Sequence, residues 1–129
     1  MKPETTAFLE KAREFLTKAH GLLKGTWPDE AGRAAYLAGF HAAQALIFES
    51  TGNTFKTHSG VQAEFARCVK DDPRVDIELR RFLGRAYNLK AVADYETGPG
   101  SHVTAEQADE AIRTANLFVE CIDDILAAG

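Results

Sequence analysis

The sequence predicts an all-α protein, an up-and-down helical bundle of four long helices plus a shorter one. Apolar residues recur at helical spacing along almost the whole chain, and no window alternates apolar and polar residues as a half-buried strand would. The 129 residues fit a single domain, residues 1–129, with enough chain to bury a core without metal or disulfide support.

The first helix is expected over about residues 5–24. Gly25 then serves as its C-cap, and the segment Trp27-Pro28-Asp29 provides a turn and an N-cap for the next helix. One face of this helix is apolar and is expected to pack on the core: Phe8, Leu9, Ala12, Phe15, Leu16, Ala19 and Leu23.

The second helix, about residues 29–50, is the most hydrophobic and the richest in small residues. Small side chains on several faces let neighbouring backbones approach closely, so we place this helix at the centre of the bundle. Gly52 or Asn53 is expected to end it in the left-handed conformation. Its small residues are Ala31, Gly32, Ala34, Ala35, Ala38, Gly39, Ala42, Ala43 and Ala45, and its larger packing residues are Tyr36, Leu37, Phe40, Leu46, Ile47 and Phe48.

The third helix is expected from about residue 58 to residue 69, stopping before Asp71-Asp72-Pro73. Asp76 is a credible N-cap for a fourth helix, and Thr104 with Gln107 forms a capping-box pattern for a fifth helix over about residues 105–127. The expected inward residues are Val61, Phe65, Ala66 and Val69 of the third helix; Leu79, Phe82, Leu83, Ala86, Leu89, Val92 and Ala93 of the fourth; and Ala108, Ala111, Ile112, Ala115, Leu117, Phe118, Cys121, Ile122 and Ile125 of the fifth.

Charge and composition limit the classes of function. The net charge of −4 and the pI near 5.5 argue against sequence-independent binding of nucleic acid, which needs a basic surface, although a small basic site remains open. Cys68 and Cys121 lie in separate helices with no CxxC spacing, which favours buried thiols over a disulfide. Charges occupy the N-terminal segment where a signal peptide needs apolar residues, and no apolar run is long enough for a membrane span, so we expect a cytoplasmic protein.

Common cofactor and metal motifs are absent, so we expect no cofactor and no metal. A di-iron bundle needs Glu-x-x-His, and none of the four histidines has a Glu three positions before it. There is no phosphate-binding GxxxxGK[ST] and no GxGxxG, and Gly98-Pro99-Gly100 is expected to be a plain turn.

Two groups of basic residues are candidates for binding phosphate. Arg81 and Arg85 are i,i+4 neighbours on the fourth helix, which also carries Arg80 and Lys90; the alternative is that they form its solvated face. His58 opens the third helix, at an exposed position suited to capping or to contact with an anion. His41, in the middle of the small-residue helix, is expected to be a packed core residue rather than a catalyst.

The end of the fourth helix gathers polar chemistry as no other segment does. Lys90 and Asp94 are an i,i+4 pair on one helix face, and Tyr95 lies one position further round. We predict a functional site there. The alternative is a surface ion pair with the Tyr95 ring packed over the end of the bundle.

Four segments together resemble the HEPN family, and most closely its small prokaryotic stand-alone members. They occur in the family's order and spacing and cover essentially the whole chain: RAAYLAGFHAAQALIFESTG, THSGVQAEF, LKAVADYE and VTAEQADEAIRTANLFVECI. The resemblance implies an all-α bundle, usually a homodimer, with a polar site near the dimer cleft built from the fourth helix. Many members are RNases or toxins, often encoded beside a minimal nucleotidyltransferase that acts as antitoxin.

The expected site departs from the pattern of active RNase members. In those members an Arg that binds phosphate is followed four to six residues later by a His that assists attack by the ribose 2′-hydroxyl, and no Arg of this chain has such a His. Small members commonly have Arg, three residues, Asp, Tyr, where this chain has Lys90, Asp94 and Tyr95. Because Lys cannot reproduce the bidentate guanidinium contact, we expect a degenerate catalytic centre at these three residues.

The resemblance also assigns a second use to the same position. In members paired with a nucleotidyltransferase, the antitoxin can add AMP to a Tyr near the catalytic His, and Tyr95 is the matching residue. We therefore expect a dimeric binding or regulatory module, the HEPN half of a nucleotidyltransferase–HEPN toxin–antitoxin type pair, with Tyr95 docked or modified by the partner. Two alternatives remain: a metal-independent ribonuclease using Arg81, Arg85 or Lys90 with His58 or Tyr95, and a nucleotide-binding accessory protein without toxicity.

Overall fold

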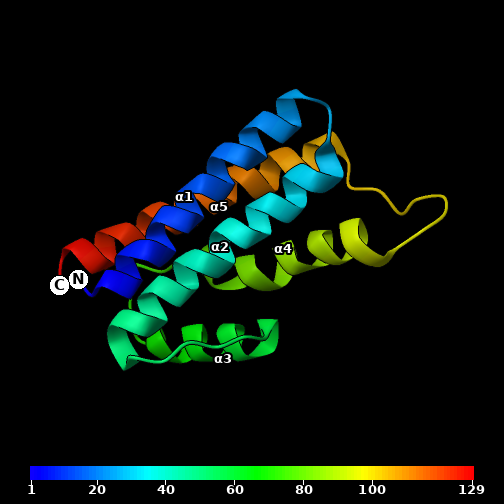
Figure 1. Cartoon of the computed structure of the whole chain (residues 1–129). Helices are drawn as coiled ribbons and strands as arrows, with labels where there is room; N and C mark the ends of the chain where they lie inside the picture. The colour runs from blue at the N-terminus through cyan, green and yellow to red at the C-terminus, as the bar shows by residue number, and fades with distance from the viewer.

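The computed structural model describes residues 1–129 and contains five α-helices and no strand (Figure 1). Four helices are long, with 22, 24, 19 and 23 residues, and α3 has 11 residues. This confirms the predicted all-α bundle of four long helices and a shorter one. Their bounds are α1 Pro3–Lys24, α2 Pro28–Thr51, α3 His58–Cys68, α4 Ile77–Tyr95 and α5 Ala105–Ala127.

Helix α2 is the centre of the bundle, as its small residues predict. It contacts each of the other four helices, which lie around it. Because its contact surface is mostly Cβ atoms and backbone, neighbouring helices can approach its axis closely. The small residues that are buried on it are Ala31, Gly32, Ala34, Ala35, Ala38, Gly39, Ala42, Ala43 and Ala45.

The predicted helix ends are mostly confirmed. Gly52 follows α2 in the left-handed conformation with φ of 75°. The Asp76 carboxylate accepts from Leu79 N at 3.0 Å and caps α4 as predicted. At the start of α3 the cap is Thr57, whose hydroxyl accepts from Gly60 N at 3.0 Å, and not His58. The capping box before α5 is also present.

The start of α2 differs from the prediction. The helix begins at Pro28, one residue earlier than expected, and Trp27 occupies the N-cap position. Asp29 instead accepts hydrogen bonds from Val103 N at 2.6 Å and pairs with His102 Nδ1 at 2.9 Å. Asp29 therefore fastens the end of the α4–α5 loop to α2.

Two residues expected to face inward are exposed. Ala66 lies on the solvent side of α3, whose buried residues are Val61 and Phe65. Leu117 is 59% exposed, because the buried face of α5 is centred on Ala115 and Phe118 and a residue between them in sequence points away from it.

The cysteines are free thiols, as favoured, but they are half-buried rather than fully buried. Burial raises the pKa of both thiols, which keeps them protonated at neutral pH. None of the helices combines the length and the apolar composition needed to cross a membrane.

The turn before α4 contains a carboxylate, Asp72, whose contribution to the free energy of unfolding should depend on pH. Asp72 Oδ1 accepts from Arg74 N and Nε, both at 2.9 Å, and Oδ2 from Arg74 Nη2 at 2.8 Å, which lowers the pKa of Asp72 to about 2. A pKa below that of the unfolded chain stabilises the fold above about pH 4, and this stability is lost as the pH falls toward 2.

We expect Asp72→Asn to unfold about 1 kcal/mol more easily than wild type at pH 6, a value reduced for solvent screening, and the difference to shrink toward pH 2. Urea unfolding at pH 6, 4 and 2.5 measures this. Asp71→Asn removes the adjacent carboxylate, which forms no ion pair, and serves as the control. Equal differences at all three pH values would contradict the assignment.

Candidate functional site

The polar cluster predicted at the end of α4 is present. Lys90 Nζ lies 2.9 Å from Asp94 Oδ2 and 3.5 Å from the Tyr95 hydroxyl. The structure adds Arg33 of α2, whose Nε donates to Asp94 Oδ1 at 3.0 Å. One carboxylate thus lies between two cations from different helices, beside a phenol.

The charges of this cluster are held partly away from solvent. The side chains of Lys90 and Asp94 are 18% and 21% exposed. Burial raises the pKa of Asp94, but the ion pairs with Lys90 and Arg33 outweigh it and hold that pKa below its usual value. The hydrogen bond to Asp94 raises the pKa of Lys90. Lys90 and Asp94 are therefore charged near neutral pH, and together with the Arg33 guanidinium they give the cluster a net positive charge beside Tyr95.

Tyr95 itself is accessible. Its side chain is 71% exposed, and the Lys90 ammonium lies 5.1 Å from the centre of its ring. Helix α4 ends at this residue, because Glu96 is extended and Gly98 and Gly100 follow with φ of 95° and 78°. The loop that begins here projects from the bundle (Figure 1), which leaves the phenol uncovered.

A cleft between α2, α3 and α4 adjoins the cluster and shares Lys90 with it. The His58 ring stacks on the Tyr87 ring with centroids 3.9 Å apart, and Tyr36 Oη lies 2.9 Å from His58 Nδ1. The cleft has a volume of about 230 Å³. Its lining residues are Tyr36, Leu37 and Phe40 of α2, Lys56 of the loop between α2 and α3, His58 of α3, and Tyr87 and Lys90 of α4.

His58 is half-buried in this cleft, whereas the sequence predicted an exposed position. Burial lowers its pKa, the charge of Lys90 lowers it further, and a hydrogen bond with Gln62 opposes both. Burial also raises the pKa of Tyr36, so the His58–Tyr36 pair is neutral near pH 7. Sequence reasoning missed Tyr36, Tyr87 and Lys56, because nothing in their spacing indicates that α2, the loop and α4 converge on α3.

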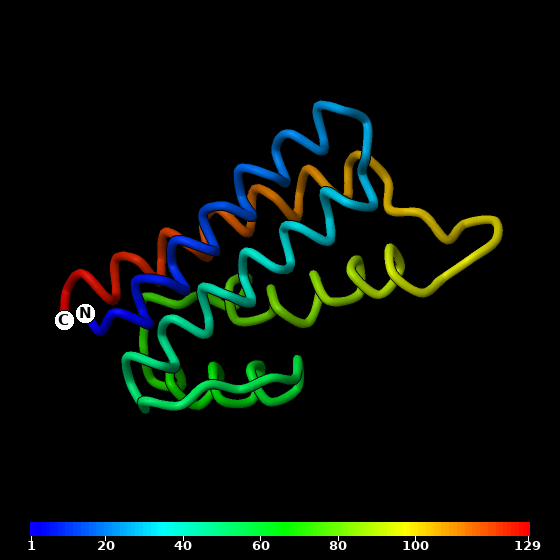
Figure 2. Tube along the Cα trace, viewed as in Figure 1, coloured from blue at the N-terminus to red at the C-terminus, as the bar shows by residue number.

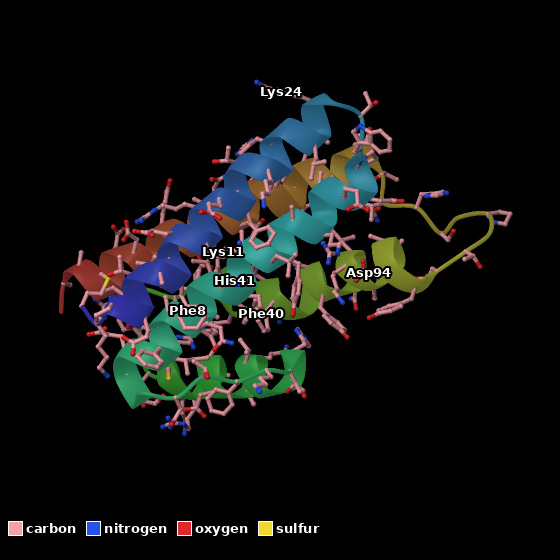
Figure 3. The ribbon with its side chains drawn as sticks, viewed as in Figure 1. Phe8, Lys11, Lys24, Phe40, His41 and Asp94 are labelled. Atoms are coloured by element: carbon pink, nitrogen blue, oxygen red, sulfur yellow. The ribbon has the colours of Figure 1, made fainter.

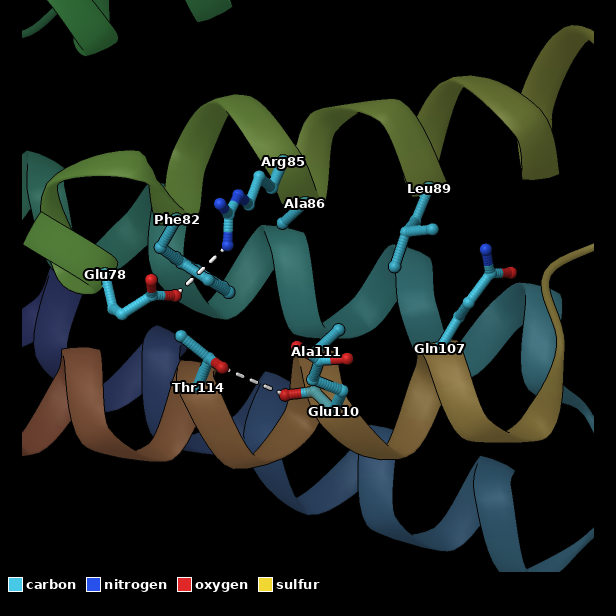
Figure 4. Close-up of a pocket in the computed structure, with 9 residues that line it drawn as sticks. All are labelled: Glu78, Phe82, Arg85, Ala86, Leu89, Gln107, Glu110, Ala111 and Thr114. Atoms are coloured by element: carbon cyan, nitrogen blue, oxygen red, sulfur yellow. Dashed lines mark hydrogen bonds and ion pairs between the residues drawn. The ribbon is translucent and has the colours of Figure 1, made fainter.

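The arginines of α4 do not join His58. Arg85 Nη1 pairs with Glu78 at 3.1 Å in a different groove, between α4 and α5 (Figure 4). Arg81 is exposed and forms no ion pair. The Arg80 guanidinium donates hydrogen bonds to backbone carbonyl oxygens of the turn between α3 and α4. The predicted phosphate-binding set of His58, Arg81 and Arg85 therefore does not form one site.

The α4–α5 groove has an apolar floor and a charged rim (Figure 4). Its volume is about 180 Å³. Phe82, Ala86, Leu89 and Ala111 form the floor, and Glu78, Arg85, Gln107, Glu110 and Thr114 complete the lining. Leu117 on α5 and Ile77 at the start of α4 are exposed on the same pair of helices.

His41 is a packed residue. Figure 3 labels His41 on α2. Its Nδ1 lies 2.8 Å from the Leu37 carbonyl oxygen, and its ring stacks on Phe15 of α1 with centroids 5.3 Å apart. Burial lowers its pKa.

No group of three His, Cys, Asp or Glu side chains is arranged as metal ligands would be.

Comparison with known proteins identifies the family. The family model described as the HEPN domain matches residues 5–125 of this chain. The chain belongs to the HEPN family. The resemblance of its four sequence segments to HEPN proteins is thereby confirmed.

Relatives of this chain occur in Methanocaldococcus jannaschii and Thermotoga maritima. A Methanocaldococcus jannaschii protein named "Putative toxin MJ0605" is 32% identical over 126 residues, which cover 98% of this chain and 91% of that protein. A Thermotoga maritima protein named "UPF0332 protein" is 32% identical over 116 residues, covering 90% and 86%. The crystal structure of TT1696 from Thermus thermophilus shares the fold, with a TM-score of 0.76 and 24% identity over 95% of this chain and 98% of that one.

Proposed function

We propose that this HEPN protein is the HEPN half of a nucleotidyltransferase–HEPN toxin–antitoxin type pair and acts as a dimeric binding or regulatory module with a degenerate RNase centre. The observation that carries the proposal is the exposed Tyr95 phenol beside Lys90, which shares the Asp94 carboxylate with Arg33. The similarity to a protein named as a toxin supports the assignment to such a pair.

The cluster is poorly equipped to cleave RNA. Lys90 is a point charge already paired with Asp94, and it cannot contact phosphate through two parallel N–H groups as Arg does. A tyrosine hydroxyl also lacks the readiness of imidazole to exchange a proton near neutral pH. The same groups suit a phenol that accepts a phosphoryl-type group from a partner enzyme.

In that reaction the Tyr95 oxygen attacks the α-phosphorus of a nucleoside triphosphate bound by the nucleotidyltransferase. The new oxygen–phosphorus bond forms as the bond from the α-phosphorus to the bridging oxygen breaks, and pyrophosphate leaves. The phenol proton passes to a base of the partner enzyme. Lys90, 3.5 Å from the hydroxyl, stabilises the negative charge on the phosphate, as preorganised cations do in phosphoryl transfer.

The α4–α5 groove supports the dimeric part of the proposal. Its apolar floor and the nearby exposed side chains of Leu117 and Ile77 offer the core of an interface, with the Glu78–Arg85 pair at the rim. Light scattering of Leu117→Glu against wild type tests this, since a charge at the centre of an interface should yield monomers. If the variant keeps the oligomeric state of wild type, the groove is not part of the dimer interface.

We expect the wild-type protein to gain the mass of one adenylyl group when it is co-expressed with a minimal nucleotidyltransferase from a neighbouring gene, and Tyr95→Phe to gain none. The physical reason is that Phe lacks the oxygen that forms the bond to phosphorus. Intact mass spectrometry measures the gain. Tyr87→Phe, which loses the same hydroxyl group on the same helix, should be modified like wild type. An unmodified wild-type protein that also fails to co-purify with the enzyme would refute the pairing.

A second candidate function is a metal-independent ribonuclease, favoured by the shared lining of one cleft by His58 and Lys90. Here His58 would supply the imidazole that the α4 motif lacks. RNA cleavage in the presence of EDTA by wild type, Lys90→Ala and Tyr95→Phe separates the two functions. If wild type cleaves RNA and both variants do not, the protein is a ribonuclease and the second function replaces the first.

A further inference from the structure

The turn between α1 and α2 carries the only tryptophan of the chain on its surface. Trp27 is 62% exposed, and its indole N–H forms no hydrogen bond within the protein. A single exposed apolar side chain is common on folded proteins and assigns no function by itself. The backbone of the turn and the charges around the ring show what this side chain can bind.

The turn accommodates the indole ring at a cost to its own backbone. Leu22 O accepts from Trp27 N at 2.8 Å and Leu23 O from Thr26 N at 3.1 Å, which ends α1 in a Schellman motif. Thr26 occupies the position at which glycine is usual, with φ of 64°, and is the only non-glycine residue of the chain with a positive φ. The glycine lies one residue earlier, where a Cβ on Gly25 would come within 3.1 Å of Trp27 Cδ1. The sequence thus has glycine where the ring needs room, and not where the backbone favours it.

The ring borders a cleft where the α1–α2 turn meets the end of the α4–α5 loop. These two segments lie side by side at one end of the bundle (Figure 1), joined by the hydrogen bond from Val103 N to Asp29. The cleft has a volume of about 350 Å³. Its lining contains two carboxylates and no lysine or arginine: Thr26, Trp27, Pro28, Asp29, Glu30 and His102.

The two carboxylates differ in how much of their charge is compensated. Asp29 is paired with His102 Nδ1 at 2.9 Å. Glu30 is exposed and forms no ion pair, because Arg33, one turn further along α2, is paired with Asp94 at 3.0 Å. The positive end of the α2 dipole amounts to about half an elementary charge, which is less than the Glu30 carboxylate carries. The cleft therefore combines an open aromatic ring with an unpaired negative charge, and this combination favours a cation.

We propose that this cleft binds an arginine side chain of a partner protein, with the guanidinium stacked on the Trp27 indole and paired with the Glu30 carboxylate. Tryptophan attracts cations more strongly than the other aromatic side chains, and the planar guanidinium stacks on rings in a way that an ammonium cannot. Tryptophan and arginine are also enriched among the residues that dominate protein interfaces. This surface goes beyond the proposed function, because it involves neither the Tyr95 cluster nor the α4–α5 groove.

Tryptophan fluorescence reports on this site without a label, because Trp27 is the only tryptophan. The test titrates the whole protein, at constant ionic strength, with a capped Gly-Arg-Gly peptide and with matched peptides in which citrulline or lysine replaces arginine. We expect the arginine peptide to change the Trp27 emission at millimolar concentrations and to shift the NMR amide signals of residues 26–30 and 102. The citrulline peptide, which has nearly the same shape and no charge, should bind at least about threefold more weakly. The lysine peptide should lie between the two, because it keeps the charge and loses the stacking.

Three variants locate the contacts. Glu30→Gln should weaken binding of the arginine peptide about threefold, and Trp27→Ala, followed by NMR, about fivefold. Glu30→Gln changes one exposed charge, so it tests the site even if Trp27→Ala does not fold. The matched control is Glu4→Gln, which removes an exposed and unpaired carboxylate from the first turn of α1 and should leave binding unchanged.

Absence of binding at millimolar concentrations would overturn the site. Equal affinities of the arginine and citrulline peptides, or of wild type and either Glu30→Gln or Trp27→Ala, would do so as well. Lysine binding as tight as arginine binding would overturn the stacked guanidinium. Free arginine carries an α-carboxylate that Glu30 repels, so binding tighter than that of the peptide would identify a free amino acid in place of a partner protein. Because Glu30 lies outside the Tyr95 cluster, modification of Tyr95 in Glu30→Gln remains a separate readout of the proposed function.

Discussion

Gly39→Ala is expected to lower the free energy of unfolding by about 1–3 kcal/mol, although alanine is the better helix former. A Cβ at this position of α2 would lie 2.2 Å from Phe82 Cε2 and 3.0 Å from Cδ2. The Phe82 ring is 3% exposed and packs on Phe118 with centroids 5.1 Å apart, so an added methyl group must displace this ring or the helix that carries it. The variant should therefore force α2 and α4 apart. Urea unfolding followed by circular dichroism gives the free-energy difference.

The matched control is Gly21→Ala, at an exposed position of α1 where a Cβ would meet no atom within 4 Å. We expect this variant to be about 0.5–1 kcal/mol more stable than wild type, because alanine restricts the unfolded chain. Opposite signs for one chemical change would show that the close approach of α2 and α4 is responsible. A Gly39→Ala protein as stable as wild type would contradict the packing at Phe82.

Arg80→Ala is expected to lower the free energy of unfolding by about 2–4 kcal/mol. The Arg80 guanidinium donates to the carbonyl oxygens of Val75 and Val69 at 2.8 Å and of Asp72 at 2.7 Å. These three bonds hold the turn between α3 and α4, and alanine leaves all three carbonyl groups without that donor. Chemical unfolding at pH 7 measures the loss.

Arg81→Ala provides the control, because it removes the same charge from the next residue, which is exposed and forms no ion pair. Its stability should lie within about 0.5 kcal/mol of wild type. Arg80→Lys should recover little of the loss, since an ammonium cannot donate in three fixed directions. Equal effects of Arg80→Ala and Arg81→Ala would contradict a structural role for Arg80.

The fold could be predicted because each helix carries its own local signals. The small residues of α2 predict its central place, and the caps at Asp76 and Thr104 predict where α4 and α5 begin. The prediction that Leu117 is buried was wrong. An apolar residue next to the buried face of a helix looks like a core residue when only the sequence is considered. Only the position of α5 in the bundle shows which side of it faces solvent.

The contacts of the candidate site could likewise be predicted from the sequence only in part. Lys90, Asp94 and Tyr95 lie within six consecutive residues of one helix, so helical geometry alone brings them together. Arg33 reaches the same carboxylate from 61 residues away, and Tyr36 reaches His58 across 22 residues. Contacts of this kind depend on how helices cross, and no spacing along the chain predicts them.

Helix α2 bears on how this protein can acquire new ligands. Arg33 and Tyr36 contact the two candidate sites, while Ala34 and Ala35 between them are buried in the core. Most changes along this helix would disturb packing and binding together. The segment that joins α2 to α3 and the loop that follows α4 both lie outside the helices (Figure 2). Libraries that vary residues 53, 54 and 56 and residues 96–100 keep the Thr57 cap of α3 and are therefore the most direct route to altered recognition on an unchanged bundle.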